Sequence, residues 1–165
     1  MDLSLTLQSI LDTARTPLEA LTDEQVKTPR SPGKWSPIQI IGHLCDSAIN
    51  NVGRIIHAQE TDELIFDGYS QDFWVEANDY QNANWSSILE LFFHLNHRMS
   101  EIVKNIPEET LNLPRKKHNI TPPSYAYWEP YELPTLGFWI RDYMGHMEHH
   151  LKQILPDYEP VVWNH

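Results

Sequence analysis

The residues best suited to chemistry in this sequence are two histidines near its C-terminal end, His146 and His150. On a helix, side chains four positions apart lie on one face, with Cβ atoms about 5–6 Å apart. Two imidazoles in this arrangement can bind one metal ion. A third histidine from a neighbouring helix would complete a three-histidine site that leaves room for water or substrate. His43 is the candidate for this third position.

The helical periodicity also predicts where the histidine pair points. At about 100° per residue, His146 and His150 fall at the border of the apolar face of their helix, where a cleft would lie. His149 projects closer to solvent, and we do not choose it as a ligand. The residues predicted on the solvent side are Arg141, Gly145, Glu148 and Lys152.

His43 allows two interpretations. It lies nearly opposite the apolar stripe of its own predicted helix, and periodicity alone therefore favours an exposed polar face. Alternatively, the polar residues form a strip that lines a pocket at one end of the bundle. The companions of His43 on this strip are Gln39, Asp46, Ser47, Asn50 and Arg54.

Four apolar stripes with a helical period must position these side chains. They predict helices over about 2–21, from 37 to His57, over 85–105 and over 136–155. Pro17 predicts a kink or a break in the first of them. Capping boxes fit Thr22-Asp-Glu-Gln25, which could start one short extra turn, and Ser36-Pro-Ile-Gln39, which starts the second long helix.

Four amphipathic helices of this length predict an all-α fold, a four-helix bundle in a single domain over 1–165. The long connections, 58–84 and 107–135, follow the second and third of these helices, so a simple up-down-up-down order is not assured. Structureless loops of such length are uncommon unless functional, and we expect short helical turns or a cover over a site. The aromatic group of the second connection could form a lid or pocket wall, or cover the bundle end; it comprises Tyr125, Tyr127, Trp128 and Tyr131.

Composition excludes some classes of partner. The chain has 12 Lys and Arg against 23 Asp and Glu, a formal net charge of −11. This acidity disfavours nucleic acids and anionic membranes. Cys45 is the only cysteine, which precludes an intrachain disulfide, and its place on an apolar stripe predicts a small core residue rather than a nucleophile. With no signal peptide and no long apolar run, we expect a cytoplasmic protein.

Four segments together resemble the DinB-like superfamily of metal-binding four-helix bundles, which includes YfiT-type metal-dependent hydrolases and bacillithiol transferases. The segments are Pro32-Gly-Lys-Trp-Ser36, Ile41-Gly-His-Leu-Cys-Asp-Ser47, Gln71-Asp-Phe-Trp-Val75 and His146-Met-Glu-His-His-Leu-Lys-Gln-Ile154. The resemblance implies a DinB/YfiT-like fold with His43, His146 and His150 as metal ligands. It also makes a homodimer plausible.

Three neutral imidazoles suit one divalent ion, Zn²⁺ or Ni²⁺ first, with iron or manganese as alternatives. Such an ion would activate a water for hydrolysis, or the thiol of a small co-substrate for attack on an electrophile. The substrate is expected to be a small molecule. Asp46 and Asp142 could orient the imidazoles or serve as general base, or be solvated surface carboxylates. The alternative function is a non-catalytic metal-binding or dimeric interaction protein.

Overall fold

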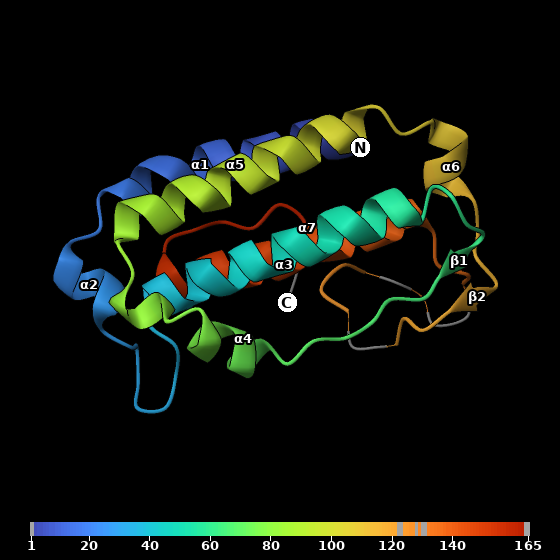
Figure 1. Ribbon diagram of the computed structural model, residues 1–165. Helices are drawn as coiled ribbons and strands as arrows, with labels where there is room; N and C mark the ends of the chain where they lie inside the picture. The colour runs from blue at the N-terminus through green and yellow to red at the C-terminus, as the bar shows by residue number, and fades with distance from the viewer. Residues whose placement is uncertain (1, 122–123, 128, 130–131, 164–165) are drawn as a thin grey trace.

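Four long helices dominate the structure, a computed structural model that describes residues 2–121, 124–127, 129 and 132–163 (Figure 1). The predicted all-α four-helix bundle is confirmed, and each predicted helix is present within a few residues of its expected ends. The four are α1 (Leu3–Glu19), α3 (Pro37–His57), α5 (Trp85–Lys104) and α7 (Leu136–Ile154).

The order of the helices around the bundle differs from their order in the chain. Helix α3 packs against α5 and α7, and α1 packs against the same two helices. Consecutive long helices α1 and α3 therefore lie diagonally across the bundle. In Figure 1, α1 and α7 run in one direction and α3 and α5 in the other. The long connections allow this arrangement, because neither has to be a tight turn between antiparallel neighbours.

Short-range signals fix the helix ends. Pro37 occupies the first turn of α3, and the Gln39 side chain accepts a hydrogen bond from the Ser36 amide at 3.0 Å. Thr22 and Gln25 form the predicted capping box of α2 (Asp23–Lys27). Pro17 does not break α1, because it lies in the last turn, where little helix remains to be disrupted.

The two long connections contain short elements, as expected. The first holds β1 (Glu63–Leu64), α4 (Gln71–Ala77) and the 3₁₀ turn η1 (Tyr80–Asn82). The second holds α6 (Glu108–Asn112) and β2 (Lys117–His118), which pairs in parallel with β1. The sequence did not predict this two-residue pairing. Buried Arg115 fastens the same corner by donating to the carbonyls of Ala58 and Thr61.

The core lies between the four long helices and consists of their apolar stripes. Cys45 is fully buried within it, as predicted, and its thiol lies 3.7 Å from the carbonyl oxygen of Ile88. None of the helices in the described part of the chain is long and apolar enough to span a bilayer. The largest fully buried side chains include Leu7, Ile10, Leu11, Leu18, Ile41, Leu44, Phe92, Phe93 and Met99.

Candidate metal centre

Three imidazoles from two helices converge inside the bundle. Nε2 of His43 on α3 lies 3.2 Å from Nε2 of His146 on α7. The ring of His150 lies one turn further along α7, with its centroid 5.0 Å from that of His43 and 4.7 Å from that of His146. One nitrogen from each ring can be chosen so that all three lie within 4.8 Å of one another. The structure therefore brings together the three histidines that the sequence singled out.

The electrostatic surroundings keep these rings neutral. Burial lowers the pKa of His43 to about 4, although the nearby Asp72 carboxylate acts in the opposite direction. Burial, together with repulsion from His43, lowers the pKa of His150 to about 3. Burial and the other histidines hold the pKa of His146 well below its ordinary value. At neutral pH each ring therefore has a nitrogen lone pair to offer.

A hydrogen bond fixes which nitrogen of His150 is free. Its Nδ1 lies 3.0 Å from Oε1 of Gln153, so Nδ1 carries the proton and Nε2 keeps its lone pair. The Gln153 amide group in turn donates to Nε2 of His149 at 2.9 Å. His149 thus holds Gln153, which in turn orients His150. His149 itself is not one of the three clustered histidines, in agreement with the prediction that it is not a ligand.

The donor set fits a small divalent cation. Two nitrogens bound tetrahedrally to one zinc ion at about 2.0–2.1 Å would lie about 3.3 Å apart, close to the separation of the His43 and His146 nitrogens. The cluster also contains no carboxylate, so a bound ion would keep most of its charge to act on a fourth ligand.

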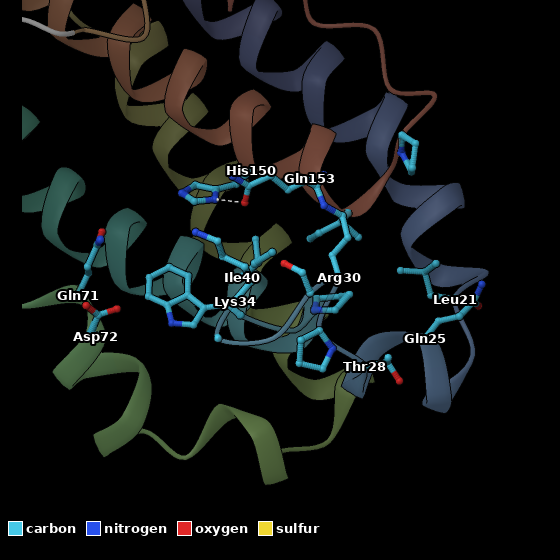
Figure 2. A pocket seen from close by; sticks show the side chains of 17 residues that line it. Leu21, Gln25, Thr28, Arg30, Lys34, Ile40, Gln71, Asp72, His150 and Gln153 are labelled. Atoms are coloured by element: carbon cyan, nitrogen blue, oxygen red, sulfur yellow. Dashed lines mark hydrogen bonds between the residues drawn. The ribbon is translucent and has the colours of Figure 1, made fainter.

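Two hollows meet at the cluster. The larger, of about 710 Å³, is lined by His150 and Gln153 from α7, Gln71 and Asp72 from α4, and cationic Arg30 and Lys34 from the α2–α3 loop (Figure 2). The smaller, of about 260 Å³, is lined by His43 and His146 and runs along α3 and α7. Gln71 contributes to both hollows.

Two aromatic side chains hold the cluster in place. The Trp35 ring, from the loop before α3, lies 4.9 Å from the His43 ring, and the Tyr125 ring lies 5.0 Å from that of His146. Tyr125 thereby forms a wall of the smaller hollow, whereas Tyr127 is exposed. The other two members of the predicted aromatic group, Trp128 and Tyr131, lie outside the described residues.

His43 is 2% exposed. The interpretation that periodicity favoured, in which His43 lies on an exposed polar face, is therefore wrong. Helix α4 and the turn η1 pack over this side of α3. Gly42 permits the contact, because a Cβ there would lie 2.3 Å from the Tyr80 ring. The alternative prediction, a polar strip facing a pocket, is correct for His43, Ser47 and Arg54, which line the smaller hollow, whereas Asp46 and Asn50 line neither hollow.

The two candidate aspartates lie in different surroundings, and neither is a solvated surface carboxylate. Asp46 is buried, accepts hydrogen bonds from Tyr80 at 2.7 Å and Asn78 at 3.3 Å, and does not line either hollow. Asp142 lines the smaller hollow with His43 and His146. Its Oδ1 accepts from the backbone amides of Tyr125 and Ala126. Burial nonetheless raises the pKa of Asp142.

The prediction that one face of α7 is exposed to solvent is also partly wrong. Glu148 is fully buried, because the chain after α7 turns back over this face. Its carboxylate accepts from the amides of Val161, Val162 and Trp163 and from the Tyr158 hydroxyl, at 2.7–3.0 Å. Gly145 lies directly under the backbone of Tyr125.

Some residues around the cluster were not identified as functional from the sequence. Trp35, Tyr69 and Gln71 line the hollows, yet none has a chemistry or spacing that marks it. The only signal was their place in or beside segments that resemble a family. Side chains of this kind acquire a role through the fold, because the loops that carry them close over the ends of α3 and α7.

Two bacterial proteins are similar to this chain over most of its length. "Putative metal-dependent hydrolase YfiT" of Bacillus subtilis (strain 168) is 24% identical over 147 residues, which is 89% of this chain and 77% of the relative. A "Putative metal-dependent hydrolase" of Geobacillus thermodenitrificans (strain NG80-2) is 24% identical over 150 residues, 90% and 78% of the two chains.

A solved structure shows the same architecture. It is described as "YfiT from Bacillus subtilis is a probable metal-dependent hydrolase with an unusual four-helix bundle topology". It superimposes with a TM-score of 0.74 at 22% identity, over 93% of this chain and 82% of the other. The DinB superfamily model matches residues 7–154, a range that contains all four long helices nearly complete and the three clustered histidines. The chain therefore belongs to the DinB superfamily.

Proposed function

We propose that the protein is a metal-dependent hydrolase of a small molecule, with His43, His146 and His150 as ligands of one divalent ion. The observation that carries this proposal is the convergence of three neutral imidazoles within 4.8 Å where two hollows meet. The names of the two relatives, which both describe a metal-dependent hydrolase, support it. Zn²⁺ or Ni²⁺ suits the donors best. When bound, the ion would act as a Lewis acid that lowers the pKa of a water or thiol at its open position.

Asp142 is our candidate for the general base. It lines the smaller hollow with two of the three histidines. Burial raises its pKa, which makes the carboxylate a better proton acceptor, while the hydrogen bonds from the amides of Tyr125 and Ala126 act in the opposite direction. Asp46 faces Tyr80 rather than a hollow, and we assign it to holding η1 against α3.

Transfer of a small thiol to an electrophile is the second candidate. The observation that favours it is the pair of hollows, one reached from His150 and the other from His43 and His146. Two reactants could approach the same centre from different sides in this arrangement, whereas hydrolysis needs space for only one organic molecule. In either reaction the same three histidines and Asp142 have the same roles.

The test begins with elemental analysis of protein purified without a histidine tag or chelator. We expect about one equivalent of a divalent metal, lost in His43→Ala and His150→Ala. His94→Ala serves as control, because this histidine is exposed on α5 with a side chain 78% accessible. Equal metal content in His94→Ala and His150→Ala would contradict the proposal.

Activity assays then separate the candidate reactions. The metal-loaded protein is assayed on ester, amide and electrophile substrates, with and without an added small thiol. Turnover without thiol supports hydrolysis, and strict dependence on thiol supports transfer. Asp142→Asn should lower turnover and leave metal content unchanged. Metal-loaded protein that turns over nothing in either panel would favour the non-catalytic alternative.

A further inference from the structure

A line of polar side chains on α3 leads from the histidine cluster to an arginine. His43, Ser47, Asn51 and Arg54 follow one another at steps of four, four and three, which places them on one face of the helix. All four line the smaller hollow. Over 11 residues the helix rises about 16 Å, so Arg54 enters the hollow at the end away from the cluster.

Helix α7 forms the opposite wall and runs antiparallel to α3 (Figure 1). Two contacts set the register between the walls. His43 meets His146 at one end, and the Trp139 indole donates to the Asn51 side chain at 2.9 Å nearer the other. Asp142 falls between these contacts on α7, so it lies closer to the cluster than Arg54 does. The hollow therefore has a reactive end and a cationic end.

Arg54 is only partly engaged by the protein. Its guanidinium donates to the carbonyl of Asp67 and lies 5.6 Å and 5.8 Å from the centres of the Phe66 and Trp139 rings. Within the described ranges, no carboxylate approaches it closely enough to form an ion pair. A guanidinium has five N–H donors in a planar fork that matches a carboxylate or phosphate. Among the described residues, the Asp67 carbonyl is the one acceptor for this fork, and Arg54 lines the hollow.

The surroundings of Arg54 would strengthen its attraction for an anion. The side chain is half-buried beside the packed rings of Phe66 and Trp139, where charges are screened less than in water. Burial lowers the pKa of Arg54, and Asp67 and Tyr69 raise it by less. The net lowering indicates that the neighbouring groups do not fully replace the lost hydration of the guanidinium.

We propose that Arg54 binds an anionic group, a carboxylate or phosphate, at the end of an elongated small-molecule substrate whose reactive group lies at the three histidines. The inference rests on the proposed function only for the position of the reactive group. At about 260 Å³ the smaller hollow lies just below the size range of pockets for drug-sized ligands, so the bound part is small. Ser47, Asn51 and Tyr69 line the path between the two ends.

A purely structural role for Arg54 is the competing explanation. In that case the side chain would only hold the loop around Asp67 against α3. Both roles predict lower thermal stability in Arg54→Gln, so stability alone does not separate them. Only anion binding predicts that the variant loses its preference for charged over neutral ligands of the same length.

The first experiment uses cobalt-loaded protein and two matched series of thiols, ω-mercapto-carboxylates and ω-mercapto-alcohols of increasing chain length. Thiolate binding to Co²⁺ gives a charge-transfer band, from which each affinity is measured. We expect the wild type to prefer one length of carboxylate over the matched alcohol by about tenfold, the effect of a charged hydrogen bond. Arg54→Gln should remove this preference and leave the alcohols unchanged, and Arg54→Lys should retain part of it.

The control is Arg98→Gln, which removes the same charge from an exposed position on α5. If Arg54→Gln keeps the carboxylate preference of the wild type and of Arg98→Gln, the proposal is wrong. The proposal is also wrong if the wild type itself binds the carboxylates no more tightly than the matched alcohols.

A second measurement does not depend on metal. Metal-free protein is titrated with hexanoate and with hexanol while the indole N–H signal of Trp139, assigned through Trp139→Phe, is followed by NMR. A shift caused by hexanoate alone, absent in Arg54→Gln, supports the anion site even if no metal binds and the proposed function fails. Equal responses to both ligands would refute it while leaving the metal centre untouched.

Discussion

Gln153 lies one turn beyond His150 on α7, and its side-chain oxygen accepts the Nδ1 proton of that histidine at 3.0 Å. This bond fixes both the tautomer and the ring orientation of His150. A ligand histidine held in this way presents its free nitrogen without an entropic cost at the moment of metal binding. Gln153 is therefore a positioning residue of the proposed centre.

Replacing Gln153 with Leu should weaken metal binding about tenfold, the lower end of the effect of losing such a partner. Gln153→Glu keeps an acceptor for His150 but loses the donor to His149, and should bind metal at least as well as the wild type. Zinc affinity measured by competition with a chromophoric chelator tests both. Gln59→Leu, at an exposed position in the turn just after α3, is the matched control. Unchanged affinity in Gln153→Leu would remove the assigned role.

Glu148 fastens the C-terminal segment to the bundle. Its carboxylate has four donors, three of them backbone amides, and is fully buried. Glu148→Ala leaves these donors without an acceptor and should reduce the free energy of unfolding by about 3 kcal/mol. Glu148→Gln should be intermediate. Denaturant unfolding checks this prediction, with the exposed Glu101→Gln expected to change stability by less than about 0.5 kcal/mol.

Glu148 also shows what could not be predicted from the sequence. The apolar stripe of α7 was predicted correctly because it depends only on local periodicity. The face opposite the stripe was assigned to solvent, yet Glu148 is buried there. Its burial depends on a return of the chain after Pro156 that carries no periodic signal. A single helix defines which side is apolar, but not whether another segment covers its polar side.

His43 illustrates the same limit at the candidate centre. The three histidines could be selected from residue type, spacing and family resemblance, and their convergence agrees with that selection. Periodicity alone favoured exposure for His43, since α4 and η1 cover a polar face that the sequence does not mark as buried. Caps and stripes predicted the bundle, whereas the loops that enclose the hollows had no comparable signal.

Gly42 and Gly53 form a matched pair of glycines on α3. A Cβ at position 42 would lie 2.3 Å from the Tyr80 ring, whereas position 53 has nothing within 4 Å. Gly53→Ala should therefore stabilise the protein by about 0.5–1 kcal/mol through helix propensity. Gly42→Ala should destabilise it by about 1–3 kcal/mol, the cost of forcing an extra group into packed surroundings.

Thermal unfolding of the two variants measures this difference. Because the Tyr80 hydroxyl is hydrogen-bonded to Asp46, Gly42→Ala should also loosen α4 and η1, which faster amide hydrogen exchange over 71–82 would report. Equal stability of Gly42→Ala and Gly53→Ala would show that Tyr80 does not pack on α3 as described.

Cys45 lies two residues from His43, yet its position argues against a role as nucleophile. The side chain is fully buried in the core, and burial raises the pKa of its thiol to about 12. We expect no alkylation by iodoacetamide in the native protein at pH 8 and rapid alkylation after denaturation, measured by mass spectrometry. Cys45→Ala should keep metal content and turnover while losing about 1 kcal/mol of stability, since a small core group is removed. Loss of turnover with intact metal binding and normal stability would instead place the thiol in the reaction.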